Sequence, residues 1–136
     1  MAEKMTKANP PRLFGVFTPI GHVVLAFTND ADAAQAREAL LTGGYEADEV
    51  LQFRSDEVIA DAEQTRDNLG LLARMGLNME WSEVERDVQL AQQGAAFLVV
   101  YAPSDAETNR VMNVARRFNT TLARKYHRLA IEHLLG

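Results

Sequence analysis

The sequence contains one pattern twice: an apolar run of strand length leads through a polar turn into an amphipathic helix. In the first copy, residues 22–28 are apolar almost throughout, and Asn29 or Asp30 caps the helix that follows. In the second copy, residues 96–102 form the most apolar run of the chain, and a helix capped by Ser104 follows it. The repeat predicts two strand–helix units that contribute to one sheet.

A second strand-like run follows each helix and completes two β-α-β halves. The first of these runs covers residues 49–53 and mixes polar with apolar side chains, as in an edge strand; the other covers residues 121–127. Two such halves in 136 residues predict one α+β domain, a ferredoxin-like β-α-β-β-α-β sandwich. Folds of this kind carry many unrelated functions, so the architecture alone assigns none.

The connection between the two halves is too long for a hairpin. One helical pattern starts near Ser55, and a second starts at Ser82, where Glu85 completes the spacing of a capping box. The stretch from Gly70 to Gly76, which has no phosphate-binding spacing, predicts a turn between them. We therefore expect a single domain over residues 22–136 with a helical insert over residues 55–94, between strands two and three.

The two ends of the chain differ in pattern from this domain. Residues 1–21 contain three prolines and predict an N-terminal tail, whose apolar patch over residues 13–17 docks on its own sheet or on a partner subunit. At the other end, residues 129–135 predict a short terminal helix, with His133 near its C-terminus as a capping partner.

Composition places the chain in the cytoplasm. There is no cysteine, which fits a reducing compartment and excludes disulfides, a thiol nucleophile and a thiolate metal site. No signal-peptide pattern begins the chain, and no apolar run approaches the ~20 residues of a membrane span. We therefore expect a cytoplasmic protein that does not contact a membrane.

The net charge of −5 is unevenly distributed. Residues 30–68 carry eleven acidic side chains and three arginines, whereas residues 95–136 carry six basic and three acidic side chains. Two interpretations remain open: solvated helix faces of opposite charge, or association of the acidic half of one copy with the basic half of another.

Three residues are candidates for ligand binding. In an antiparallel sheet of the predicted order, the start of strand one lies beside the end of strand four, so His22 approaches Tyr126 or His127. Two imidazoles and a carboxylate could bind zinc, but no closely spaced histidine pair exists, and a histidine at a strand edge needs no ligand. We expect no metal site and no cofactor.

Residues of catalytic type occupy structural positions in this pattern. The carboxylate pairs, among them Asp30/Asp32 and Asp56/Glu57, stand mostly at predicted helix starts, where the helix dipole favours negative charge. The serines at predicted caps belong to no G-x-S-x-G motif. We therefore predict no catalytic residues and favour a non-enzymatic role, with a small metal- or histidine-dependent enzyme ranked last among the alternatives.

RNA-recognition motifs share the predicted element order, which makes nucleic-acid binding an alternative function. Such domains stack bases on aromatic side chains of an open sheet face, and Phe27, Phe97 and Tyr101 lie on predicted central strands. The basic-plus-aromatic signature of these motifs is absent, and the chain is acidic. We expect no nucleic-acid partner.

Several turns and strands resemble one bacterial family. They comprise Gly44-Tyr45, Asp48-Glu49-Val50, Gly94, Val99-Val100 and Ser104-Asp105-Ala106-Glu107. In this pattern the chain is similar, over about residues 22–135, to the small bacterial general stress proteins of the seventeen-M, or heat-induced, type. The resemblance implies a stress-associated, non-enzymatic α/β domain and supplies no mechanism.

The resulting functional prediction is a stress-associated or regulatory module that acts by self-association or by binding a partner. The alternative is a small-ligand sensor that binds its effector at a strand-to-helix turn or at a dimer interface. We predict a homodimer, because helices on one side of the sheet leave an apolar face that a second copy would cover; the inserted helices are the competing cover. The predicted core is Val23, Leu25, Phe27, Leu40, Val50, Leu98, Val100, Val111, Val114 and Phe118.

Overall fold

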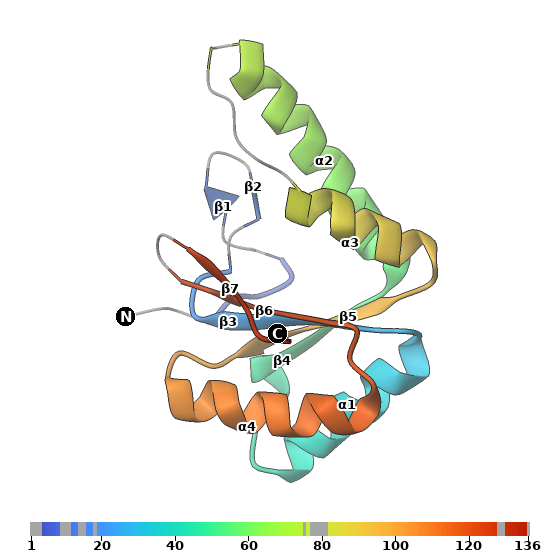
Figure 1. Cartoon of the computed structure of the whole chain (residues 1–136), viewed down its shortest axis with the longest axis vertical. Coiled ribbons are helices and arrows are strands. Elements are labelled where there is room, and N and C mark those ends of the chain that lie inside the picture. The colour runs from blue at the N-terminus through green and yellow to red at the C-terminus, as the bar shows by residue number, and fades with distance from the viewer. Residues whose placement is uncertain are drawn as a thin grey trace.

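The computed structural model describes residues 4–8, 12–13, 16–17, 19–74, 76, 82–127 and 130–135. Within these residues, four α-helices and a five-stranded antiparallel sheet form a mixed α/β fold. The sheet is the middle layer: α1 and α4 pack on one face, and α2 and α3 lie on the other (Figure 1).

The strands of the sheet stand in the order β4-β5-β3-β6-β7, and every neighbouring pair is antiparallel. The four strands predicted from the two halves are all present, and β4 lies at an edge as its mixed polarity predicted. Their bounds are β3 (His22–Phe27), β4 (Val50–Phe53), β5 (Ala96–Tyr101), β6 (Leu122–Tyr126) and β7 (Ile131–His133).

The helices begin where the sequence offers a side chain that satisfies a free backbone N–H. Asn29 accepts a hydrogen bond from the backbone of Asp32 and caps α1, and Ser104 accepts one from Glu107 and caps α4. The helices are α1 (Asp30–Thr42), α2 (Ser55–Arg74), α3 (Ser82–Gln92) and α4 (Asp105–Ala115), with short 3₁₀ turns at Ala47–Glu49 (η1) and Arg116–Phe118 (η2).

The cap of α4 provides a first test. Replacement of Ser104 by alanine removes the Oγ that accepts from the Glu107 N–H at 3.2 Å, and is expected to destabilise the fold by about 1 kcal/mol. Urea denaturation measures the change, and Ser104→Thr, which keeps a capping hydroxyl, serves as the control. Equal stability of the alanine and threonine variants would contradict the capping role.

Alternation along the strands sends every second side chain into a core on the α1/α4 face, which we call the first face. Eight of the ten predicted core residues are fully buried here; Val114 and Phe118 are partly buried and pack against the same cluster. The fully buried members include Val23, Leu25, Phe27, Leu98 and Val111.

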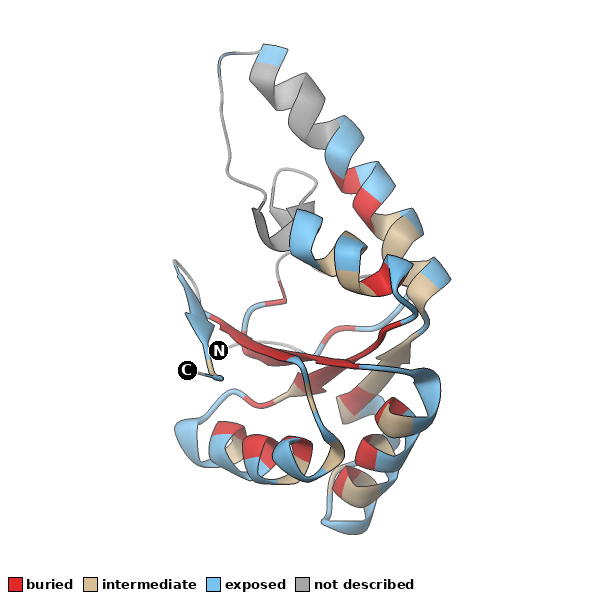
Figure 2. Cartoon of the chain, turned by 45° about the vertical axis from the view of Figure 1, so that its right-hand side comes forward, coloured by how far each residue is buried: buried red, intermediate tan, exposed pale blue. Residues whose placement is uncertain are grey.

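The alternate side chains form a second core, on the face toward α2 and α3, which we call the second face. Val24, Phe97 and Val99 belong to it, and Val58 and Ile59 of α2 pack against them. The inserted helices therefore cover the face that the dimer prediction treated as bare, and Figure 2 shows buried central strands between two helical layers. The apolar sheet face on which the dimer prediction rested is therefore covered within one chain.

The end of the chain corrects one prediction: residues 130–135, the described part of the segment expected as a terminal helix, are not helical. Ile131–His133 is strand β7, and the backbone N–H of Leu134 bonds the carbonyl of Ala123 at 2.9 Å. A helix of about two turns leaves most of its end groups without intrahelical partners, whereas pairing with β6 satisfies the same backbone. His133 therefore lies in a strand opposite Arg124, and its predicted role at a helix C-terminus was wrong.

The predicted turn from Gly70 to Gly76 is also corrected in part. Helix α2 continues through Gly70 to Arg74, and its far end extends away from the sheet (Figure 1). A single glycine weakens a helix interior by about 1 kcal/mol relative to alanine and does not by itself end the helix. Gly76 does adopt a left-handed backbone, with φ of 82°, just beyond the helix.

The N-terminal region contributes to the packed body. Residues Arg12–Leu13 (β1) and Val16–Phe17 (β2) pair as a small antiparallel ladder, and β2 lies near α2. Met5 is 5% exposed and belongs to the core of the second face. The element order thus adds the β1–β2 ladder before the predicted domain and has β7 after β6, while the two predicted inserted helices, α2 and α3, lie between β4 and β5.

Candidate functional site

His22, the first candidate residue, is buried at the start of β3. Its Nε2 lies 3.2 Å from the backbone nitrogen of Met5, and its Nδ1 lies 3.0 Å from the carbonyl oxygen of Ile20. Because the Met5 N–H donates to Nε2, this nitrogen carries no proton, and Nδ1 donates to Ile20. The ring also contacts that of Tyr101, with centroids 5.2 Å apart. Both imidazole nitrogens are thus engaged by backbone.

The surroundings of His22 favour the neutral imidazole. Burial lowers the pKa of His22 below its ordinary 6.5, and the positive charge of Lys125 lowers it further. The carbonyls of Ile20 and Pro19 act in the opposite direction and do not reverse the shift. At neutral pH the uncharged ring therefore contacts Met5 near the N-terminus, Ile20 just before β3, and Tyr101 of β5.

Tyr126 and His127, the other candidates, have different surroundings. The register Val23 to Lys125 places His22 beside Tyr126 on the second face, and the Gly21 N–H bonds the Tyr126 carbonyl at 2.9 Å. His127 instead follows the end of β6, where its Nε2 lies 3.0 Å from Glu132 Oε1. The structure brings His22 and Tyr126 together and gives His127 an exposed ion-pair partner near β7.

Within the described ranges, no group of three histidine, cysteine, aspartate or glutamate side chains converges on one point. The nitrogens of His22 are both used by backbone groups.

A buried ion pair that the sequence analysis missed lies deeper on the second face. Arg124 of β6 is 0% exposed, and its Nη2 lies 2.6 and 2.7 Å from the two carboxylate oxygens of Asp87 on α3. The guanidinium also lies 5.8 Å from the ring centre of Tyr126. The pair ties the inserted helix to the sheet. Alternation in β6 was the available signal, since it places Arg124 between Leu122 and Tyr126 on one face.

A second buried cation, Lys125, lies on the opposite face. Its Nζ donates to the carbonyl oxygen of Ala102 and to Thr108 Oγ1, the latter at 2.8 Å. Burial lowers the pKa of Lys125, and the carboxylates of Asp105, Glu107 and Glu132 oppose that shift. Ala102 directly follows β5, and Thr108 lies near the start of α4. Lys125 therefore bonds both sides of the turn that connects β5 to α4.

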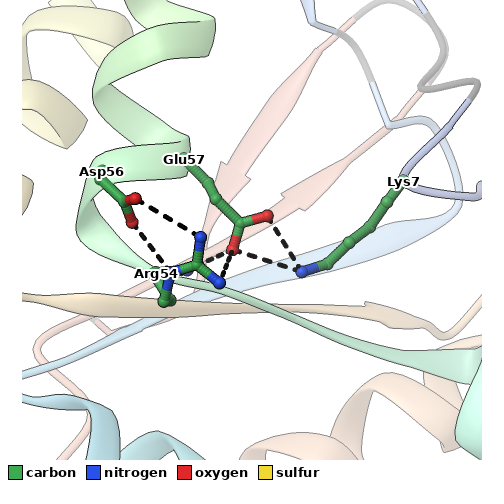
Figure 3. Close-up of polar contacts among 4 residues, drawn as sticks. All are labelled: Lys7, Arg54, Asp56 and Glu57. Atoms are coloured by element: carbon green, nitrogen blue, oxygen red, sulfur yellow. Dashed lines mark hydrogen bonds and ion pairs between the residues drawn. The ribbon is translucent and has the colours of Figure 1, made fainter.

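Residues 4–8, which we call the N-terminal strap, run over β4 and the start of α2. Lys4 Nζ lies 3.5 Å from Asp48, and Lys7 Nζ lies 3.2 Å from Glu57 Oε2 and 4.5 Å from the centre of the Phe53 ring. Figure 3 shows Lys7 and Arg54 converging on the carboxylate of Glu57.

The carboxylates beneath the strap are held ionised by these neighbours. The backbone N–H of Arg54 lowers the pKa of Glu57 first, and Lys7 lowers it further. The Arg54 side chain, 3.0 Å away, lowers the pKa of Asp56. These groups are largely exposed, so each pair stabilises the strap only weakly.

The three aromatic residues considered for RNA stacking do not share a surface. Phe27 is fully buried on the first face, whereas Phe97 and Tyr101 lie on the second face. Helices α2 and α3 lie over that second face, so these three rings form no open stacking platform.

Comparison of the chain with family models, with curated proteins and with solved structures gives no match. Among the described residues, no helix has the length and apolar character needed to cross a lipid bilayer. The class that fold and site define is therefore a mixed α/β protein whose buried polar side chains join its segments to one another. The resemblance to the general stress proteins stays a prediction.

Proposed function

We propose that the chain is a non-enzymatic, stress-associated module of the bacterial cytoplasm that acts by self-association as a homodimer. We further propose that its core is a ferredoxin-like sandwich with additions. The strand order β4-β5-β3-β6, with α1 and α4 together on one face, supports this assignment. The buried His22, Arg124 and Lys125 bond to other parts of the same chain, which supports a role without catalysis.

The observation that carries self-association is the terminal strand β7. All three of its residues are exposed (Figure 2), and β6 is its neighbour in the sheet. Exposed apolar side chains lie at both ends of this strand: Ile131 is 38% exposed, and Leu135, just beyond β7, is 43% exposed. An exposed edge strand presents unpaired backbone groups and is a template for pairing with another chain.

The hydrogen-bond pattern orients β7 for such pairing. The carbonyl of Ala130 and the N–H of Leu134 bond β6, so the backbone groups of Ile131 and His133 point away from it. At the opposite edge, the carbonyl of Val50 in β4 already accepts a hydrogen bond from Arg37 Nε of α1 at 2.8 Å. Edge pairing therefore favours β7.

A second copy of this chain fits that edge by symmetry. Antiparallel pairing about a two-fold axis at His133 places Ile131 of each copy opposite Leu135 of the other. Each copy then covers the exposed Ile131 and Leu135 side chains of the other copy, and the two sheets become continuous.

Light scattering tests the dimer with a proline at its edge. The wild type is expected to show twice the chain mass of 15.1 kDa at tens of micromolar, and Ile131→Pro is expected to show the single mass. Proline removes an N–H that points away from β6, so the β6–β7 ladder keeps its hydrogen bonds. Ile131→Thr keeps that N–H and should remain dimeric with weaker association.

Two results would count against this proposal. A wild type with the single mass rules out the dimer, and an Ile131→Pro variant that remains dimeric with an unchanged unfolding midpoint places the interface elsewhere. A module that binds a partner other than a second copy of this chain would then be the remaining alternative.

The alternative, a ligand sensor, would use a strand-to-helix turn such as the one between β5 and α4. At that turn Lys125 and Thr108 already bond the carbonyl of Ala102. The donors that would meet an effector are thus engaged within the chain, which favours self-association over the sensor. A thermal shift on addition of a metabolite panel would favour the sensor instead.

A further inference from the structure

The N-terminal strap contacts the sheet through a buried hydrogen bond at Met5. Met5 is 5% exposed, its side chain belongs to the core of the second face, and its backbone N–H donates to His22 Nε2. The strap also forms exposed ion pairs through Lys4 and Lys7, which are screened by water and salt. The buried side chain of Met5 and the acceptor that His22 provides therefore both contribute to the docking of the strap.

We propose that His22 is a proton-operated latch: the neutral imidazole holds the N-terminal strap on the second face, and protonation releases it. Proton uptake at Nε2 turns the acceptor of the Met5 N–H into a second donor that faces it at 3.2 Å. The opposite nitrogen cannot compensate, because Nδ1 already donates to Ile20. The charged ring and the docked strap therefore exclude each other.

The charged groups around the ring strengthen this exclusion. On β6, Lys125 acts on His22 as a cation and disfavours a second positive charge. Tyr101 of β5 and Tyr126 of β6 lie beside the ring on the second face. On the strap, Lys4 precedes Met5 in sequence and forms ion pairs with Asp48 and Glu49.

The next charges on the two sheet strands and on the inserted helices are already engaged. Arg124 of β6 pairs with Asp87 of α3, and Glu57 of α2 pairs with Lys7 and Arg54. Lys125 is thus the side-chain charge that acts on His22, and it opposes the imidazolium. When the strap is released, water can hydrate the protonated His22 ring.

The direction of the pH effect follows from linkage. His22 in the docked state has a pKa below 6.5, and in the released state it regains a value near 6.5. Above 6.5 both states are neutral and docking is at full strength. As the pH falls below 6.5, the ratio of released to docked strap rises by about tenfold per pH unit, until the docked pKa is reached. Acid thereby uncovers the apolar side chains beneath Met5, and this inference does not depend on the dimer.

Methionine methyl groups provide the test, because they report the two faces separately. With ¹³C-methyl methionine in the full chain, Met5 reports the strap, and Met112, which is 3% exposed on the first face, reports the rest of the fold. Between pH 7.5 and 5, the Met5 methyl signal is expected to move to the position of an exposed methionine while that of Met112 stays. The movement should share its midpoint with the titration of the His22 ring, measured in the same sample.

The matched variant is His22→Gln, whose amide accepts from the Met5 N–H and does not titrate. In this variant the Met5 signal is expected to keep its buried position down to pH 5. The latch is overturned by a Met5 signal that stays in place in the wild type, or that moves equally in His22→Gln. It is also overturned when Met5 and Met112 move together, since that is global unfolding. If the glutamine variant does not fold, unequal midpoints of Met5 and His22 in the wild type overturn it.

Discussion

Replacement of Asp87 by alanine is expected to lower the free energy of unfolding by about 3–5 kcal/mol, because it takes a carboxylate from a buried guanidinium. The Arg124 side chain is 0% exposed and that of Asp87 is 22% exposed. Most of the free-energy cost of desolvation therefore falls on the Arg124 guanidinium. Both carboxylate oxygens lie within 2.7 Å of Arg124 Nη2. Urea denaturation, monitored by circular dichroism, measures the loss.

The control for this prediction lies on the same helix. Glu85 of α3 is exposed, and Glu85→Ala is expected to change stability by less than about 0.5 kcal/mol. The double variant Asp87→Ala/Arg124→Met removes both charges and leaves an apolar side chain of similar length, so it should recover much of the loss. An Asp87→Ala variant as stable as Glu85→Ala would show that this pair does not hold α3 to the sheet.

The elements that the sequence predicted well are those determined by their own residues. Strands β3 and β5 are apolar on both sides because both faces of the sheet are covered, and such runs are visible without any structure. The caps at Asn29 and Ser104 were also predictable, because capping needs one side chain within three residues of the helix start.

The elements that were predicted wrongly depend on distant parts of the chain. The segment Ile131–His133 has helical spacing of apolar residues in its surroundings, yet it pairs with β6, and nothing within the segment itself specifies that neighbour. Gly70 favoured a turn on local grounds, whereas α2 continues past it. Differences in intrinsic helix propensity are no larger than about 1 kcal/mol per residue, proline excepted. Hydrogen bonding and packing with distant parts of the chain override them.

The candidate site divides in the same way. The nearness of His22 and Tyr126 followed from antiparallel pairing of the first and last predicted strands, which the structure has. The docking of Met5 on His22 had no signal, since a methionine in a polar tail shows no periodicity. The Arg124–Asp87 pair joins β6 to the insert, and sequence alternation could mark Arg124 as inward-facing without naming its partner.

Truncation of Leu98 to alanine is expected to destabilise the fold by about 2–5 kcal/mol. Leu98 is 0% exposed on central strand β5, opposite Leu25 of β3, and its side chain points into the core of the first face. The loss combines the transfer of the removed atoms with the cavity that they leave, and it is a large part of the roughly 5–15 kcal/mol that stabilises a typical domain. The unfolding midpoint in urea measures it.

Two comparisons separate packing at Leu98 from a general sensitivity of the fold. Leu98→Met keeps the volume and should change stability by less than about 1.5 kcal/mol. Leu41→Ala makes the same truncation at a partly buried position on α1 that packs against the same core, so its effect should be clearly smaller. Because the cavity at a partly buried site is open to water, equal effects at Leu98 and Leu41 would mean that Leu98 is not at the centre of the core.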